Sequence, residues 1–169
     1  KTQIEQDELY QWLPGKRTGP YSLRLTVTDQ VNLQAQAQIR VQIKPLTQKA
    51  KGGEVSSADD RASLYVPPNS LQKDSIVTVN RIPASAITWP LDYNWQALDL
   101  VYQIEADPPQ LKAIKPATLT ISYSGVSLPV SKQVMIFRWD GSSWKSKGGT
   151  AESGTQKISV AITELGRYG

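Results

Sequence analysis

Acidic residues are the candidate metal ligands of this sequence. Asp59 and Asp60 are adjacent in a stretch that we expect to form a turn, and Asp29 and Asp107 stand in other expected connections. Carboxylates in loops are typical ligands of calcium, which takes about six to eight oxygen atoms. Aspartate in a turn also bonds its own backbone, which explains these positions without a metal. We expect no cofactor, and calcium is the one metal that these carboxylates leave open.

Two further pairs of residues are of types that serve as catalytic groups, but the sequence around them does not complete a catalytic site. Glu105 and Asp107 could serve glycoside hydrolysis, which uses two carboxylates about 5–9.5 Å apart across a cleft, but surface solubility explains them better. Thr163 could be a nucleophile beside Glu164, yet neighbouring residues of a strand point to opposite faces. The chain has no His and no Cys, which removes the commonest general base and every thiolate site. We predict that the protein is not an enzyme.

Aromatic residues form the candidate ligand-binding feature. Trp89, Tyr93 and Trp95 lie in an irregular stretch, and Trp139 and Trp144 lie in an expected hairpin. Such residues either fill a core or, when exposed, offer a π-face on which a sugar ring can stack. Core or loop anchoring is the favoured interpretation. We name Trp89, Tyr93 and Trp95 as candidate ligand-binding residues, and expect exposure mainly of Trp89 and Trp95.

β-strands must position these residues, because apolar and polar residues alternate along most of the chain. Val, Ile, Leu, Thr, Tyr and Trp dominate the alternating segments, which favours pleated, half-buried surfaces. The fold class predicted is all-β, an antiparallel β-sandwich preceded by a β-hairpin. Strands are expected over 21–28, 33–44, 54–56, 62–66, 75–82, 98–105, 117–123, 134–139 and 157–162.

The segment from Val134 to Trp144, V-M-I-F-R-W-D-G-S-S-W, carries a hairpin signal. Asp140 and Gly141 are the pair that a tight primed turn with positive φ angles prefers. With a loop from Asp140 to Ser143, Trp139 and Trp144 should face each other across the two strands.

The charge distribution and hydropathy exclude several classes of partner. The net charge of +4 is spread thinly and forms no long basic run, so nucleic-acid binding is not indicated. No apolar stretch approaches the roughly 20 residues of a membrane span, so we expect no membrane insertion. The chain begins at Lys1 and shows no signal peptide, and we interpret it as a processed product or a piece of a longer protein.

The first part of the chain resembles the end of an immunoglobulin-like or PKD-type bacterial module. The resemblance rests on G-P-Y-S-L-R-L-T-V-T-D, followed by an alternating strand, and covers Gly19 to Ile43. Such modules have about 100 residues and seven strands, so the resemblance implies that earlier strands are missing. A lone hairpin is marginal in water, and we expect it to pack on another unit or to complete a sheet.

The remainder resembles the ZU-five-type β-sandwich, in the form found in large bacterial secreted proteins. The matching pieces occur in order: G-G-E-V, L-Y-V-P-P-N-S-L, V-Y-Q-I-E-A-D-P-P, K-P-A-T-L-T-I-S-Y, the tryptophan hairpin and I-S-V-A-I-T-E-L-G-R-Y. Some relatives cleave themselves at a His-Phe-Ser element, and here the corresponding residues 162–166 contain neither His nor Ser. We assign residues 1–45 to an incomplete hairpin with a polar tail, 46–51 to a linker and 52–169 to the sandwich.

Together these patterns predict a non-catalytic structural or interaction module of a larger secreted or cell-surface bacterial protein, extracellular or periplasmic, serving spacing, adhesion or assembly. The expected partners are other modules of the parent polypeptide or another chain. They would add to a strand edge formed by Leu33, Ala35, Ala37, Ile39, Val41 and Ile43. Two alternatives stay open, which are a carbohydrate-binding accessory module of a secreted enzyme and an autoprocessing domain.

Overall fold

The structure is a computed structural model that describes residues 19–43, 46–83, 95–108, 112–128 and 133–169. These residues form strands and loops, and no helix among them is long and apolar enough to cross a membrane. The strands are β1 (Gly19–Thr28), β2 (Gln34–Ile43), β3 (Leu46–Thr47), β4 (Gly53–Ser56), β5 (Ala62–Val66), β6 (Ser75–Ile82), β7 (Val101–Asp107), β8 (Lys112–Ser122), β9 (Ile136–Trp139), β10 (Trp144–Gly148), β11 (Thr150–Glu152), β12 (Lys157–Glu164) and β13 (Gly166–Tyr168).

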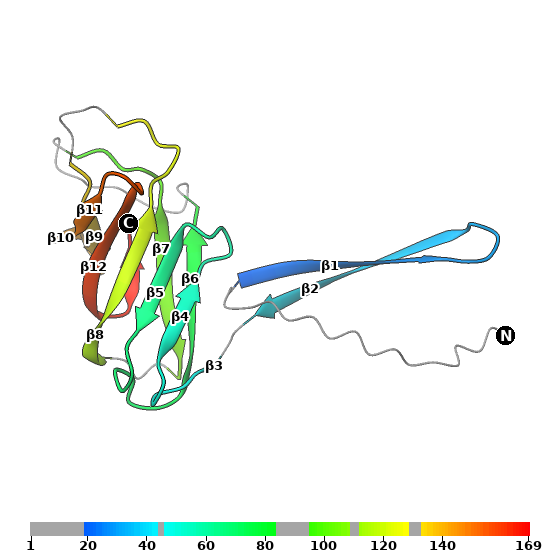
Figure 1. Cartoon of the computed structure of the whole chain (residues 1–169), viewed down its shortest axis with the longest axis horizontal. Helices are drawn as coiled ribbons and strands as arrows, with labels where there is room; N and C mark the ends of the chain where they lie inside the picture. Colours follow the sequence, from blue (N-terminus) through cyan, green and yellow to red (C-terminus); the bar gives the residue numbers. More distant parts are fainter. Residues whose placement is uncertain (1–18, 44–45, 84–94, 109–111, 129–132) are drawn as a thin grey trace.

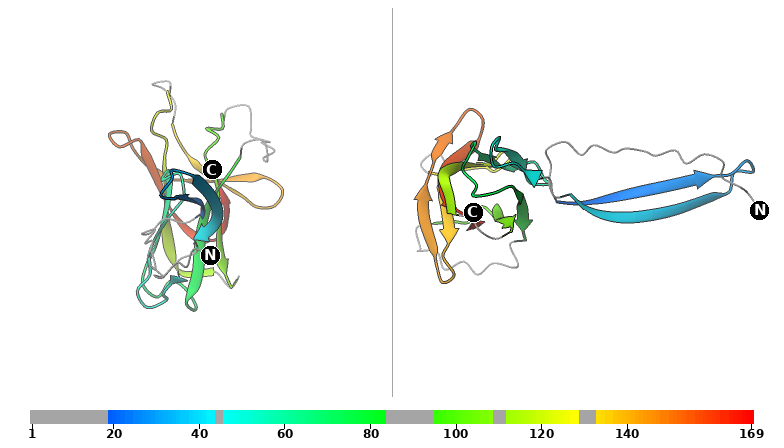
Figure 2. Two further views of the ribbon diagram at one scale, coloured as in Figure 1. Left: turned by 90° about the vertical axis from the view of Figure 1, so that its right-hand side faces the viewer. Right: turned by 90° about the horizontal axis from the view of Figure 1, so that it is seen from below.

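Eleven of these strands form two antiparallel sheets, which confirms the predicted all-β class and is consistent with a β-sandwich (Figure 1). One sheet has six strands in the order β10-β9-β13-β7-β6-β3, and the other has five in the order β11-β12-β8-β5-β4. Among the described strands, β1 and β2 pair only with each other, and Figure 2 shows that they extend away from the two sheets as a narrow ribbon.

The core lies between the two sheets and follows from the alternation of the sequence. In the five-stranded sheet, β5 buries Leu64 between Ala62 and Val66, and β8 places Leu119 beside Leu64 in register. In the six-stranded sheet, Val79 of β6 is the register partner of Ile104 of β7. These four central side chains are almost completely inaccessible to water, so their burial supplies the main driving force for the packing of the sheets.

Most predicted strands appear close to their expected places, and two, Ala62–Val66 and Ser75–Ile82, have the predicted bounds. Three short strands were not predicted. Leu46–Thr47 form β3 inside the stretch expected as a linker, and β11 and β13 occupy stretches expected as loop and chain end. Each has two or three residues, too few for alternation to show.

Two local predictions were wrong in detail. The strand expected from Leu98 begins only at Val101, because Asp99 has a φ of 55°, a left-handed conformation that extended backbone does not allow. In the tryptophan hairpin Gly141 has a φ of 106°, but Asp140 keeps a negative φ, so the turn is not the primed type. Asp140 instead begins a four-residue loop, in which its N–H donates to the Ser143 carbonyl at 3.0 Å.

Candidate functional site

The β1–β2 hairpin is the candidate interaction site, because it stands apart from the core. Ten residue pairs join the two strands without a bulge, from Gly19 opposite Ile43 to Thr28 opposite Gln34. At the tip, Asp29 Oδ1 accepts hydrogen bonds from the N–H groups of Val31 and Leu33 at 2.9 and 2.8 Å. Asp29 therefore acts as a turn residue, as the interpretation without a metal predicted.

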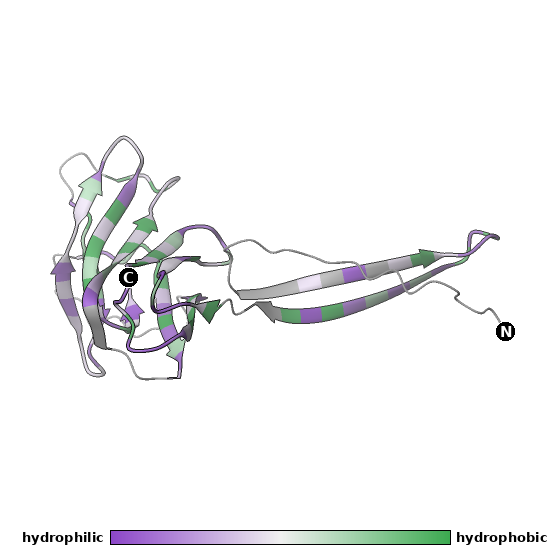
Figure 3. Cartoon of the chain, turned by 60° about the horizontal axis from the view of Figure 1, so that its bottom comes forward, coloured by the Kyte–Doolittle hydropathy of each residue, from purple (hydrophilic) through white to green (hydrophobic). Residues whose placement is uncertain are grey.

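The register gathers the apolar positions of the hairpin on one face. Leu23 pairs with Ile39 and Val27 pairs with Ala35, and directly opposed residues of an antiparallel pair share a face. Figure 3 shows the resulting alternation of apolar and polar residues along β2. Most described side chains of this face are open to water, with Ile39 61% and Val27 54% exposed, whereas Val41 near the base is half-buried.

The predicted partner edge lies on this ribbon. Leu33 ends the tip loop and is 69% exposed, and Ala35 and Ala37 are exposed in β2. Val41 is half-buried, and the side chain of Ile43 lies outside the described set. Within the described residues β2 pairs with β1 alone, so its outer edge carries backbone groups without a strand partner.

The opposite face of the hairpin is polar and carries two arginines. Arg24 pairs with Gln38, and Arg40 pairs with Ser22, so the two guanidinium groups belong to neighbouring positions on one face. The Gln38 amide donates to the Ser22 hydroxyl across the strands. No acidic side chain among the described residues forms an ion pair with either arginine.

The candidate ligand-binding aromatics are only partly described. Trp89 and Tyr93 lie outside the described residues, and Trp95 is 38% exposed. The Trp95 ring meets Phe137 of β9 edge-on, with centroids 5.2 Å apart and planes at 69°. Trp95 is thus held against the six-stranded sheet, and its role in ligand binding stays a prediction.

Trp139 and Trp144 face each other across β9 and β10, as the hairpin pattern predicted. They are register partners, with ring centroids 5.6 Å apart and planes at 57°. Trp144 is 7% exposed, so it serves packing. Neither described aromatic pair is coplanar, and a flat stacking platform does not arise from these two pairs.

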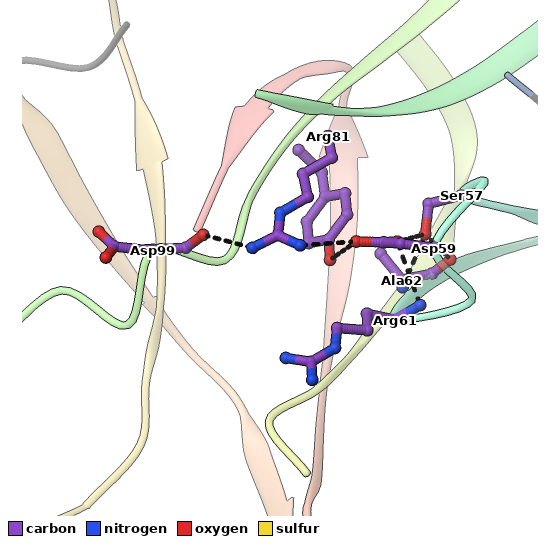
Figure 4. Close-up of polar contacts among 7 residues, drawn as sticks. Ser57, Asp59, Arg61, Ala62, Arg81 and Asp99 are labelled. Carbon is purple, nitrogen blue, oxygen red and sulfur yellow. Dashed lines mark hydrogen bonds and ion pairs between the residues drawn. The ribbon is translucent and has the colours of Figure 1, made fainter. Parts of the chain in front are cut away.

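A second cluster, which sequence reasoning missed, surrounds Asp59 in the turn between β4 and β5 (Figure 4). Its Oδ1 accepts hydrogen bonds from the Ser57 hydroxyl at 2.5 Å and the Arg61 N–H at 3.2 Å. Its Oδ2 lies 3.3 Å from an Arg81 nitrogen and accepts the Tyr102 hydroxyl at 3.1 Å. Asp59 therefore joins the five-stranded sheet to β6 and β7 of the other sheet.

The charge state of Asp59 follows from these contacts. Burial raises the pKa of the Asp59 carboxyl, but hydrogen bonds from Ser57, the Arg61 backbone and Tyr102, with the positive charge of Arg81, outweigh it and hold the pKa below its usual value. Both carboxylate oxygens are thus used by protein donors. The pKa of Tyr102 is raised, first by burial and then by the negative charge of Asp59.

A second contact between the two sheets lies at β9, three strands from β6 in the six-stranded sheet. Arg138 of β9 binds the Glu164 carboxylate of β12 at 2.8 Å, and the Tyr168 hydroxyl donates to the Glu164 carbonyl at 2.5 Å. Burial raises the pKa of Tyr168 to about 12, against the lowering effect of Arg138. Glu164, placed beside Thr163 in the sequence, therefore has a structural partner.

The two contacts are the ends of one continuous row across the six-stranded sheet. Arg81 is the register partner of Tyr102, Tyr102 of Tyr168, and Tyr168 of Arg138. We call this set the Arg-Tyr-Tyr-Arg row. Each arginine at its ends reaches an acidic residue of the opposite sheet, so the row fixes the two sheets at two separated points.

The remaining acidic candidates do not gather into a site. Glu105 and Asp107 are two residues apart on β7, and both are exposed. Within the described ranges no group of three or more acidic residues is arranged to hold a metal ion. A role for these two carboxylates in hydrolysis or calcium binding has no further support here.

A scan against protein-family models and a search of curated proteins found no match for this chain. The resemblances to ZU-five-type and immunoglobulin-like modules therefore stay predictions that rest on the quoted residues.

Proposed function

We propose that this chain is a non-catalytic structural and interaction module of a larger secreted or cell-surface bacterial protein, serving spacing, adhesion or assembly. The sandwich is the folded support, and the β1–β2 hairpin is the contact element. One observation carries the proposal: the hairpin leaves an apolar face open, with Ile39 and Leu33 more than half exposed. The largest contiguous apolar patch on the surface of a protein often serves contact.

The energetics of small sheets support the same proposal. A two-stranded hairpin is marginal in water, whereas three or more strands with a covered apolar face are stable. The sandwich has such a core, but the described contacts of the hairpin are its strand pairing, the Asp29 turn, the Gln38–Ser22 hydrogen bond and a small contact of its base with β6. Other modules of the parent polypeptide, or another chain, supply the further strands or the packing surface that the hairpin lacks.

Hydrogen exchange of the backbone amides tests this proposal. Amides of residues 19–43 should exchange quickly in the isolated chain and slowly in the longer polypeptide that carries the neighbouring modules. Amides of β5 and β8 serve as the internal control, because they lie in the core sheet and should be protected in both samples. Equal protection of the hairpin in the two samples would contradict a role as the contact element.

A further inference from the structure

The two edges of the hairpin differ in their capacity to accept another strand. Natural proteins protect exposed edges with proline, with charged side chains, above all lysine, or with bulges. β2, from Gln34 to Ile43, has no proline, lysine or bulge, and Arg40 is its one charged residue. β1 contains Pro20, which lacks an N–H donor, and its base lies close to β6 (Figure 1). Both outer edges lack a strand partner among the described strands, and the edge of β2 is the one without a proline or a contact at its base with β6.

The size of the apolar face indicates how a partner engages it. Ten residues at about 3.4 Å per residue, across two strands each about 4.8 Å wide, give a face of roughly 330 Å². A standard interface needs about 800 Å² from each partner, so a surface laid on this face alone is too small for stable binding. Backbone pairing along the edge of β2 adds a ladder of hydrogen bonds and extends the same apolar face.

The charge of the polar face indicates which charges a partner strand should carry. Arg24 and Arg40 lie together without an acidic partner among the described residues, while the rest of this face of β2 is glutamine. An added strand beside β2 places its own polar side chains next to Arg40. Acidic side chains there attract Arg40, and lysines there repel it, whereas Arg24 on β1 lies one strand further away. Opposite charges on a solvent-exposed face mainly fix register and partner choice.

We propose that β2 accepts a strand from a partner polypeptide in which apolar residues alternate with polar residues that include Asp or Glu. This inference rests on the proposed function, since it names the partner chemistry of the same hairpin. The apolar side chains of the added strand extend the face formed by Val27, Ala35, Ala37 and Ile39. Its acidic side chains lie on the face of Arg24 and Arg40.

Synthetic peptides of the length of β2 test the inference on the intact chain. The first peptide alternates valine with threonine and glutamate, the second carries lysine for each glutamate, and the third is the first with alternate amides N-methylated. Binding is measured by fluorescence anisotropy, and the contact is located by amide shifts of residues 34–43. The first peptide should bind at β2. The second should bind more weakly than the first, by a factor of up to about five. The third should show no measurable affinity.

Variants of the chain separate charge from general effects. Arg40→Gln should bring the affinities of the glutamate and lysine peptides close together, whereas Lys147→Gln, an exposed charge on β10, should leave their difference unchanged. Failure of the first peptide to bind, or equal affinity of the first two peptides for the unaltered chain, overturns the inference. Retained affinity of the N-methylated peptide also overturns it, but leaves the hairpin as a contact element, which the exchange experiment tests separately.

Discussion

Replacing Tyr102 with phenylalanine removes one hydroxyl from the contact that joins the two sheets at Asp59. The ring is fully buried and stays in place, so the change isolates the hydrogen bond of 3.1 Å to Asp59. A hydrogen bond to a charged group contributes about 1.5–3 kcal/mol. The Asp59 side chain is 26% exposed, and water replaces part of the lost bond, so we expect a loss of about 1.5 kcal/mol. For a domain of this size that lowers the Tm by about 3–6 °C.

Urea unfolding followed by tryptophan fluorescence measures the loss, and Tyr65→Phe is the matched control. Tyr65 lies on β5 with 49% of its surface exposed, so removal of its hydroxyl should change stability little. Asp59→Asn, alone and combined with Tyr102→Phe, completes a double-mutant cycle. We expect a coupling energy of about 1 kcal/mol, because the two side chains touch directly.

The effect of Tyr102→Phe should depend on pH in a defined direction. The pKa of Asp59 is lowered in the folded state, so the folded chain binds its proton less readily than the unfolded chain. The stabilisation of the folded state by the ionised Asp59 carboxylate is complete above about pH 5. It is lost as the pH falls below about 4 and passes through the pKa of Asp59 in the folded state. The difference between the original chain and Tyr102→Phe should therefore narrow in acid.

Three results would refute this account of the contact. The first is a cost of Tyr102→Phe no greater than that of Tyr65→Phe. The second is a coupling energy below about 0.3 kcal/mol, the level at which separate sites simply add. The third is a difference that widens as the pH falls.

Two further predictions concern the backbone. Gly52→Ala places a Cβ only 2.1 Å from the Val66 carbonyl oxygen at a φ of 63°, and we expect the free energy of unfolding in urea to fall by about 3 kcal/mol or more. The control Gly125→Ala, at a φ of 77° in open space, should lower it by only about 1 kcal/mol. Similar losses for the two variants would contradict the clash. Asp140→Ala should speed hydrogen exchange of the Ser142 and Ser143 amides, which donate to the Asp140 carboxylate at 2.8 Å, and leave exchange in β5 unchanged. A titration of the original chain should show the pKa of Asp140 well below the usual aspartate value, because these hydrogen bonds stabilise the carboxylate.

The longer strands could be predicted because their burial alternates. In β5 the buried residues Ala62, Leu64 and Val66 are separated by Ser63 and Tyr65, so the sequence carries the period of two directly. β13 has a single buried side chain, Tyr168, and forms only because β7 and β9 offer their edges to it. Such a strand depends on residues far along the chain, and local alternation does not reveal it.

The candidate sites, like the strands, combine features that the local sequence predicts with features that depend on residues far along the chain. The alternation of β2 predicted an apolar strand face, but the openness of its outer edge depends on which strands pair, and only the topology gives that. Asp59 was predicted as a turn residue, and it is one. Its contact with Tyr102, 43 residues away, depends on the packing of two sheets. The aspartate pattern therefore predicted the turn and missed the bond between layers.

The short strand β3 determines how a pulling force passes from the hairpin into the sandwich. β3 follows β2 closely and joins the six-stranded sheet through two residue pairs, Leu46 with Ile76 and Thr47 with Ser75. When a partner holds the hairpin under tension, this two-pair ladder bears the load before the long ladder of β6 and β7 does. Two residue pairs resist separation less than the seven that join β6 to β7, so under tension we expect β3 to detach first while the two sheets keep their packing.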